Sequence, residues 1–334
     1  MQGGLSSPPA RFCRCLVIPL PVHTLIRTID RTSSALPLQA PASMRHAMFV
    51  VAAVASLAAC AAPDSPAGLT PPLPSATLSL LSPDSLRSLR LGDGVHYHFA
   101  WSAEGPWAIH LVSADLGRCE VGLRVVPALE GDGVTRARRS VTEMTPSATA
   151  RVLAGVNGDF FAPDGTPVGP ELTPTTRRSS PRPAFAWGPG RFPRIGPGAA
   201  VDMSRAGLHV VGGFPELLDG GRMTGDLGVA ERPAFAAVRH PRTAIGLDSD
   251  QDRLWLAVVD GRQAPRSVGM SLPELVDLFL SLGADEALNL DGGGSSAMTL
   301  RGRLVSQPSD ADGERRVGNS LWLVRDETAC QRGR

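Results

Sequence analysis

The chain has 334 residues, which is enough for one large domain or two modest ones. Its 33 basic residues are all arginine and stand against 32 acidic residues. The resulting formal charge of +1 favours neither nucleic-acid binding nor a charged membrane-binding surface. Because lysine is absent, Schiff-base catalysis by lysine and a phosphate-binding loop that depends on lysine are both excluded.

A secretory signal is predicted within the first sixty residues, although not at their start. A short basic segment, residues 44–48, precedes the apolar run 49–59, which is too short for a bilayer span of about 20 residues. The run ends in Leu-Ala-Ala followed by Cys60, which is similar to the lipobox of bacterial lipoproteins. We therefore expect residues 1–43 to be a disordered over-extension of the gene, residues 44–59 a lipoprotein signal peptide, and Cys60 to carry lipid. The alternative interpretation of the apolar run is an ordinary buried helix.

This signal predicts an exported protein, lipid-anchored to the bacterial cell envelope on its periplasmic or outer-membrane face and touching the membrane through the anchor alone. Cys119 and Cys330 are then the cysteines left in an oxidising compartment and form a candidate disulfide, although the sequence does not give their separation. Residues 60–85 are rich in Pro, Ser and Ala and predict an extended tether. Residues 86–328 form the predicted folded domain, and residues 329–334 a tail.

The first half of this domain is predicted to be mostly strands. Alternating apolar residues predict strands at Val95–Trp101, Trp107–Val112 and Cys119–Val126. Thr145 and Pro146 are typical of the first turn of a helix, which would run toward Leu153. Residues 170–200 are rich in Pro, Gly and Arg, so we expect loops there around one strand, Ala184–Trp187.

The second half has clearer signals. Thr243–Leu247 and Leu254–Val259 predict a hairpin, and the second strand is apolar on both faces, which favours a central strand covered on both sides. Residues 271–274 form a capping box that opens a helix closed by Gly283. Three further strands are predicted at Ala287–Leu290, Met298–Leu304 and Ser320–Val324. The prediction is a single catalytic domain of the α+β class, with a mixed, largely antiparallel sheet core and few helices.

The loop Asn289-Leu290-Asp291-Gly292-Gly293-Gly294-Ser295-Ser296 is the main candidate for chemistry. Consecutive glycines permit positive φ and let main-chain N–H groups approach an anion closely. Asn289 and Asp291 alternate with leucines, so the two polar side chains share one face where the strand ends. The alternative is a flexible hairpin loop. The pattern also lacks the final glycine of a nucleophile elbow.

Three other segments carry candidate side chains. Asn157 and Asp159 stand in the turn-like segment 156–161, which also contains two phenylalanines. Arg242 opens a strand and is suited to bind phosphate, unless it is only one of many solvated arginines. Asp260 follows the apolar strand 254–259 and with Asp291 would supply the carboxylate pair of glycoside hydrolysis.

Metal and cofactor signals are weak. The aspartates at 248, 250 and 252 lack the glycine and glutamate of a calcium loop and predict a hairpin turn. His96 and His98 have no third ligand nearby and are expected to be exposed or packed. We therefore predict no metal and no cofactor.

In this order, these elements resemble the phosphodiester glycosidase family from about His110 to Val324. Segments 211–220, 241–246 and 269–275 also match, whereas Asp159 stands where the family motif leads us to expect glycine. The resemblance implies hydrolysis between a sugar anomeric carbon and a phosphodiester, with Asp291 or Asp260 as nucleophile or as the base that activates water. The residues expected to bind the sugar and its phosphate are Asn157, Asp159, Arg242, Thr243, Asn289, Gly292, Gly293, Gly294 and Ser295.

The expected substrate is a carbohydrate or sugar phosphodiester of envelope or extracellular glycans, and no nucleic-acid partner is expected. One alternative is a non-catalytic glycan-binding lipoprotein with the same fold. The other is a phosphodiesterase that cuts the other ester bond, which hydrolysis in labelled water would reveal.

Overall fold

The computed structural model describes residues 72–118, 120–147, 151–188, 193–197 and 208–325. These residues belong to one compact unit that extends from Ser65 to Arg334. The predicted signal peptide, Cys60, Cys119 and Cys330 lie outside the described residues, so the lipid anchor and the disulfide stay predictions. Within the described ranges, no helix is long and apolar enough to cross a membrane.

The described strands form three sheets in which all pairings are antiparallel. The largest sheet has eight strands in the order β1-β2-β3-β14-β13-β15-β11-β12. In that order they are Ser85–Gly92, Val95–Ser102, Trp107–Asp115, Arg253–Val259, Arg242–Leu247, Glu286–Asn289, Glu216–Asp219 and Arg222–Met223.

Two five-stranded sheets complete the strand content of the described residues. One has the order β17-β16-β5-β18-β4, with bounds Arg303–Leu304, Met298–Leu300, Arg151–Asn157, Asn319–Arg325 and Val121–Pro127. The other has the order β7-β6-β10-β8-β9, with bounds Arg177–Arg178, Glu171–Leu172, His209–Gly212, Ala184–Trp187 and Arg194–Gly196. The helices are short: α2 (Ser75–Leu81), α3 (Pro233–Ala236) and α4 (Leu272–Ser281). This composition confirms the predicted α+β class with a largely antiparallel core and few helices.

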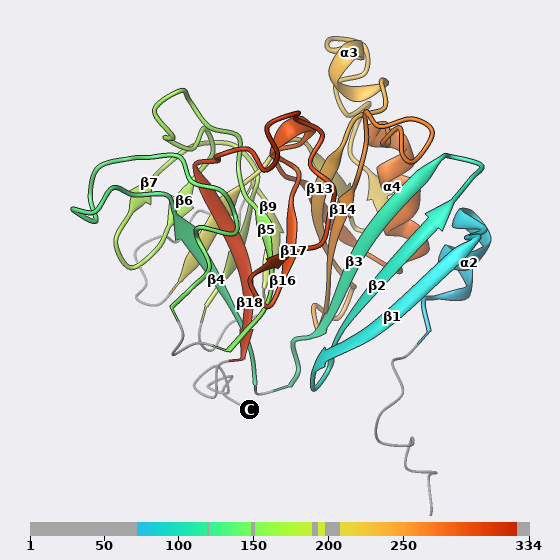
Figure 1. The fold of residues 1–334 in the computed structure, drawn as a ribbon, viewed down its shortest axis with the longest axis horizontal. Helices are drawn as coiled ribbons and strands as arrows, with labels where there is room; N and C mark the ends of the chain where they lie inside the picture. The colour runs from blue at the N-terminus through green and yellow to red at the C-terminus, as the bar shows by residue number, and fades with distance from the viewer. Residues whose placement is uncertain (1–71, 119, 148–150, 189–192, 198–207, 326–334) are drawn as a thin grey trace, which may run out of the picture. The chain divides into compact units, whose positions relative to one another are not determined.

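The eight-stranded sheet is covered on both faces (Figure 1). On one face, Leu275 and Phe279 of α4 and Leu81 of α2 pack with Leu111 and Trp255 of the sheet. Each fully buried Leu or Phe side chain contributes roughly 1.5–3 kcal/mol relative to exposure, so the two helices are held by this contact rather than by their own propensity.

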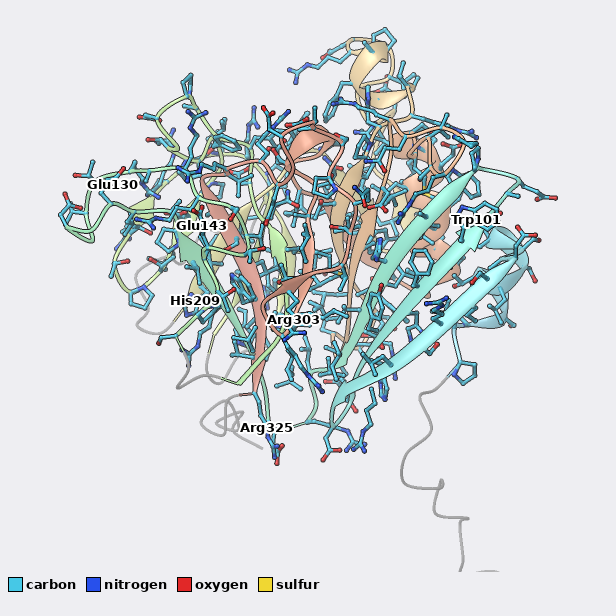
Figure 2. All side chains as sticks on the ribbon, viewed as in Figure 1. Trp101, Glu130, Glu143, His209, Arg303 and Arg325 are labelled. Carbon is cyan, nitrogen blue, oxygen red and sulfur yellow. The ribbon has the colours of Figure 1, made fainter. Side chains whose placement is uncertain are left out.

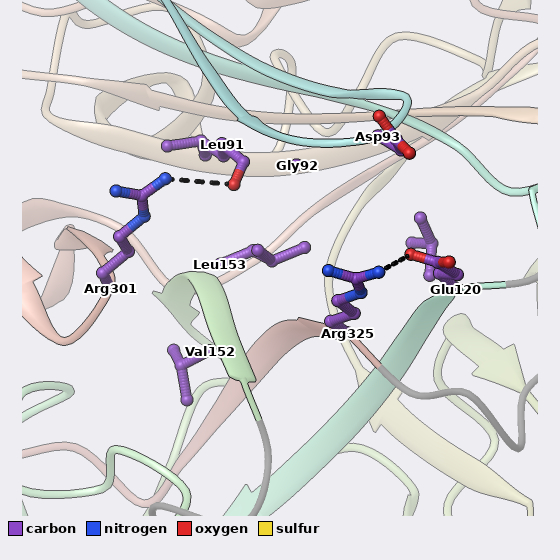
Figure 3. Close-up of a pocket in the computed structure, with 9 residues that line it drawn as sticks. Leu91, Gly92, Asp93, Glu120, Val152, Leu153, Arg301 and Arg325 are labelled. Carbon is purple, nitrogen blue, oxygen red and sulfur yellow. Dashed lines mark hydrogen bonds and ion pairs between the residues drawn. The ribbon is translucent and has the colours of Figure 1, made fainter.

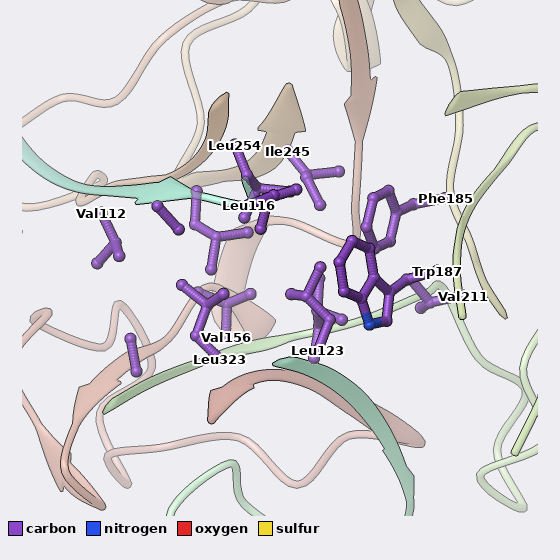
Figure 4. Packing of buried hydrophobic residues seen from close by; sticks show 14 of the residues in the cluster. Val112, Leu116, Leu123, Val156, Phe185, Trp187, Val211, Ile245, Leu254 and Leu323 are labelled. Carbon is purple, nitrogen blue, oxygen red and sulfur yellow. The ribbon is translucent and has the colours of Figure 1, made fainter. Parts of the chain in front are cut away.

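The opposite face packs on the two smaller sheets and forms the second core (Figure 4). Ile245 and Leu254 of the large sheet meet Leu323 of β18 and Phe185 and Trp187 of β8. The predicted central strand is therefore confirmed, because β14 lies between β3 and β13 and alternates between the two cores.

The local signals for α4 are also confirmed. Ser271 accepts the Glu274 N–H and the Glu274 carboxylate accepts the Ser271 N–H, which completes the capping box. Gly283 has φ of 81° at the helix end, a conformation that glycine adopts without strain. The turn between β13 and β14 is the plain hairpin turn predicted, with Asp248 accepting the N–H groups of Asp252 and Arg253.

Two local predictions are wrong. Residues 145–147 are irregular rather than helical, and Leu153 lies in strand β5, which pairs with β16 and β18. Helix α2 falls inside the segment predicted to be a tether. The apolar side chains of Leu73 and Leu81 are buried, so this segment packs as part of the folded domain. Strand β8 is confirmed, but its sheet also contains β6, β7 and β9, which lie where loops were expected.

Candidate active site

Strands β5, β13 and β15 bring the predicted site residues to one edge of the molecule (Figure 1). Strand β13 begins at Arg242, and the antiparallel strand β15 ends beside it at Asn289. The chain then enters the glycine loop, where residues 293–295 form a single 3₁₀ turn. The end of β5 joins the loop because the Asp291 N–H donates to the Gly158 carbonyl at 3.0 Å.

Asn157 is the hydrogen-bonding centre beneath the loop. Its side-chain amide donates to the Asp291 carbonyl at 2.6 Å. Its Oδ1 accepts the Thr243 hydroxyl at 2.7 Å and the Ala297 N–H at 3.2 Å. Asn157 and Thr243 are both 0% exposed. The structure therefore makes these two residues supports that fix the loop, and the expectation that they contact substrate is not supported.

Asn289 fixes the neighbouring aromatic segment. Its side-chain amide donates to the Phe214 carbonyl at 2.6 Å, and its main-chain carbonyl accepts the Phe214 N–H at 2.8 Å. Asn289 is 1% exposed, so it too acts through its neighbour rather than on the surface. This pairing sets the position of Phe214 beside the loop.

The three glycines are required by close contacts. Gly293 has φ of 60°, and its N–H donates to the Pro241 carbonyl at 2.9 Å. A Cβ on Gly292 would lie 2.9 Å from the Pro241 carbonyl oxygen, and one on Gly294 would lie 2.2 Å from an Arg315 nitrogen. The Gly292 N–H donates to the Asp291 carboxylate at 2.9 Å. The N–H groups of Gly292 and Gly293 are thus used inside the loop, so the prediction that they bind phosphate does not hold in this conformation.

Asp291 is the partly exposed carboxyl of the site. Burial raises its pKa to about 6, although the Ser295 side chain, the hydrogen bond from the Gly292 N–H and the charge of Arg315 oppose the rise. Asp291 is therefore largely ionised at neutral pH and sits at the rim, where a substrate can reach it. Ser295 lies buried behind it.

Asp159 is the second carboxyl of this edge. It is 1% exposed, and its Oδ2 accepts the Gly169 N–H at 2.5 Å. Burial is the main reason that its pKa is raised to about 7. The negative charge of Asp291 contributes to this rise, and the positive charge of Arg182 opposes it. Asp159 is thus a buried carboxyl whose ionisation the negative charge of Asp291 opposes.

Asp260 lies in a buried hydrogen-bonding network at the end of β14. The Asp260 carboxylate is 1% exposed and accepts the Gln307 N–H at 2.9 Å. Its other oxygen lies 3.1 Å from Arg266 and 3.3 Å from His110. Both oxygens are therefore engaged in a buried network, and Asp260 is a support for the segment that contains Gln307.

Arg242 is the buried cation of the site. Its guanidinium donates to the carbonyls of Met270 (2.8 Å), Phe235 (2.6 Å) and Val238 (3.1 Å). Burial lowers its pKa to about 10, with a smaller contribution from the charge of Arg262. None of the described ion pairs gives Arg242 a carboxylate partner. These three carbonyls and the charge of Glu274 offset the cost of burying the guanidinium.

An aromatic cluster borders the loop on the side of α3. Phe214 stacks on Phe235 with ring centroids 6.5 Å apart, and Phe160 meets Phe235 edge-on at 6.1 Å. Arg182 and Arg232 lie 5.3 and 5.4 Å from the Phe214 ring centre. The signal for Phe160 was visible in the sequence. Phe214 lies in segment 211–220, which resembles the family, but nothing in the sequence shows that Phe235 joins it, because only the fold brings the two segments together.

Four buried polar atoms at this edge lack a hydrogen-bond partner among the described residues: Asp159 Oδ1, Asn289 Oδ1, Ser295 Oγ and Ser296 Oγ. Buried polar groups in native proteins nearly always have a partner, which can be water or a ligand. Their grouping around one loop marks this edge as the place where a polar ligand belongs.

A cavity of about 370 Å³ lies at the opposite end of β5 and β18 (Figure 3). Arg301 there donates to the Leu91 carbonyl at 3.2 Å, and Arg325 pairs with Glu120 at 2.5 Å. None of the predicted site residues lines it. The cavity is therefore separate from the candidate active site.

The sequence profile of the phosphodiester glycosidase family matches residues 150–324, which is more than half of the chain and contains the whole edge described above. The chain belongs to the phosphodiester glycosidase family. The match covers the glycine loop, the Asn157 segment and the strand that begins at Arg242.

Curated relatives share shorter segments. The SPβ prophage-derived protein YomE of Bacillus subtilis is 44% identical over 86 residues, which is 26% of this chain and 13% of YomE. The bovine and human N-acetylglucosamine-1-phosphodiester α-N-acetylglucosaminidases are each 42% identical over 76 residues, which is 23% of this chain and 14% of theirs. The aligned segments thus span about a seventh or less of these relatives.

Solved structures share the fold. The catalytic domain of the zebrafish N-acetylglucosamine-1-phosphodiester α-N-acetylglucosaminidase superposes with a TM-score of 0.54 at 20% identity, over 73% of this chain and 85% of that one. A hypothetical protein from Synechocystis gives 0.57 at 18% identity, over 72% and 64%. These likenesses establish the architecture.

Proposed function

We propose that this protein hydrolyses the bond between the anomeric carbon of a sugar and a phosphodiester, with Asp291 as the catalytic carboxylate. The observation that carries the proposal is that Gly292 contacts both Asp291 and Arg242. Gly292 donates its N–H to the Asp291 carboxylate. Arg242 lies against the same glycine, with its Cα and Cδ 3.9 Å from where a Gly292 Cβ would stand.

This arrangement suits a substrate in which the anomeric carbon, an electrophile, is bonded to an anionic phosphate. The ionised Asp291 either attacks the anomeric carbon or takes the proton from an attacking water. The bond from the anomeric carbon to the phosphate oxygen breaks, and the phosphate leaves as a phosphomonoester anion, which needs no proton from the enzyme. Arg242 and the nearby Arg262 stabilise that departing charge.

Substitution of Asp291 by asparagine tests the proposal. The variant keeps the shape of the side chain but cannot act as base or nucleophile, so turnover of a sugar-1-phosphodiester should fall by at least about 100-fold. Asp164→Asn, an exposed carboxylate elsewhere, is the matched control and should leave turnover unchanged. A folded wild-type protein that binds these compounds without cleaving any would support the alternative, a glycan-binding protein.

Hydrolysis in ¹⁸O-labelled water identifies the bond that breaks. Label in the released sugar is the expected result, because water attacks the anomeric carbon. Label in the released phosphate would instead identify a phosphodiesterase and overturn the proposal.

We also propose that the protein is exported and lipidated at Cys60, and that its substrates are envelope or extracellular glycans. The support is the apolar run 49–59 and the residues that precede Cys60. Cys60→Ala should abolish incorporation of a labelled fatty acid and release the protein from the membrane fraction. Equal incorporation into both proteins would contradict lipidation at this residue.

A further inference from the structure

The cavity of about 370 Å³ at the end of β5 away from the glycine loop is lined by residues of two sheets (Figure 3). Leu91 and Gly92, at the end of β1, line it from the large sheet. Val121 of β4 and Leu153 of β5 line it from the smaller sheet. Leu91, Val121 and Leu153 are buried members of the core between these sheets. The cavity therefore extends that core toward the surface.

Charged side chains surround the apolar walls. Both carboxylates that line the cavity already have an arginine partner: Asp93 forms an ion pair with Arg90, and Glu120 pairs with Arg325 at 2.5 Å. Arg301 donates to a main-chain carbonyl at 3.2 Å and joins no ion pair in the part of the chain that the structure describes (Figure 3). Its charge therefore favours a ligand with one negative charge, whereas the two carboxylates would repel a multiply charged anion.

The backbone at Arg301 is a second, independent observation. Arg301 and Gly302 form the two-residue turn between β16 and β17, with φ of 50° and 77°. Positive φ at both residues is typical of a type I′ turn, in which asparagine, aspartate and glycine are favoured. Arginine adopts this conformation at a cost, because its Cβ crowds the main chain. The turn alone does not account for an arginine at this position, whereas its side chain lines the cavity.

We propose that this cavity binds a small amphipathic monocarboxylate, with its apolar part packed on the three core residues and its carboxylate bound by the Arg301 guanidinium. The planar guanidinium matches a carboxylate through two parallel hydrogen bonds. The apolar part of the ligand leaves water for a surface that already belongs to the core. The volume of the cavity is within the range of small-molecule sites. None of the candidate catalytic residues lines the cavity, so the inference is independent of the proposed function.

Calorimetric titration with three matched compounds tests this inference. Octanoate has both the apolar tail and the charge, acetate lacks the tail, and octan-1-ol lacks the charge. Wild type should bind octanoate more tightly than either of the others, and octanoate should raise its Tm. Arg301→Asn should weaken the affinity for octanoate about tenfold, because it removes a charge-assisted hydrogen bond. The ligand-free variant should be at least as stable as wild type, since asparagine is favoured in this turn.

Arg303→Gln is the matched control, because Arg303 is an exposed arginine of the same hairpin that does not line the cavity (Figure 2). This variant should bind octanoate as wild type does. The inference is overturned if wild type does not bind octanoate, if it binds octan-1-ol equally well, or if Arg301→Asn keeps the affinity of wild type for octanoate. Each of these results concerns binding alone, so none of them depends on whether the protein cleaves a sugar phosphodiester.

Discussion

The buried Asp159 carboxyl gives the sharpest test of the electrostatics of the site. Its pKa is raised from 3.8 to about 7, chiefly by burial. One pKa unit corresponds to about 1.4 kcal/mol, so ionising Asp159 in the folded protein costs about 4 kcal/mol. Asp159 has a higher pKa in the folded protein than in the unfolded chain. The folded protein therefore binds more protons than the unfolded chain between about pH 4 and pH 7. The free energy of unfolding therefore falls as the pH rises through that window.

Asp159→Asn removes this dependence. Asparagine still accepts the Gly169 N–H and cannot ionise. The free energy of unfolding of the variant and of wild type is measured in urea at pH 5 and pH 8. The variant should gain about 3 kcal/mol on wild type between pH 5 and pH 8, because most of the cost of ionising Asp159 falls between those values. Asp164→Asn should show no such change, since Asp164 is exposed. A difference between variant and wild type that is the same at both pH values would refute a raised pKa at Asp159.

Three further outcomes are expected. Because Asp291 must be ionised to act and its pKa is raised to about 6, kcat/KM should rise with pH around pH 6, and a flat profile would exclude it as nucleophile or base. Thr243→Val removes the hydrogen bond to Asn157 Oδ1 and should cost about 1–2 kcal/mol in urea unfolding, whereas an unchanged midpoint would mean that the bond contributes nothing. In Gly213→Ala the new Cβ would stand 2.5 Å from the Asn289 carbonyl oxygen, so we expect about 1–3 kcal/mol of destabilisation. Gly131→Ala meets nothing within 4 Å and should stay within about 0.5 kcal/mol of wild type.

The sequence predicted those elements whose signal is local. The capping box at Ser271, the apolar stripe of α4 and the doubly apolar strand β14 each lie within a dozen residues, and all three are present. Each can be recognised without knowing its partners, because helix periodicity and capping depend on near neighbours in the chain.

Elements that depend on distant partners could not be predicted. Strands β6 and β7 have two residues each, too few to show alternation, and they exist because β10 supplies an edge about forty residues further on. Leu153 lies in a strand because β18 pairs with β5 from the other end of the domain. The helix signal at Thr145 is weaker than those pairings, so tertiary contacts decide the structure there.

The candidate site likewise combines features that the sequence predicts locally with features that depend on distant parts of the chain. The sequence placed Asp291 and Asp260 at strand ends, and both do lie at one edge of the large sheet. It could not give the direction of either side chain. Asp260 follows β14 and Asp291 follows β15, with β13 between them, so their strands are about 10 Å apart. His110 and Arg266 then fix the Asp260 carboxylate in a buried network.

The carboxyl whose charge is coupled to that of Asp291 comes from a different sheet. Asp159 follows β5, and β5 reaches the loop only because the large sheet packs on the smaller one. The hydrogen bonds of Asn157 to Asp291 and Thr243 join the two sheets at this point. The reactive edge is therefore a product of the packing between sheets, and a change in the core beneath it should alter the pKa of Asp291 without touching the loop itself.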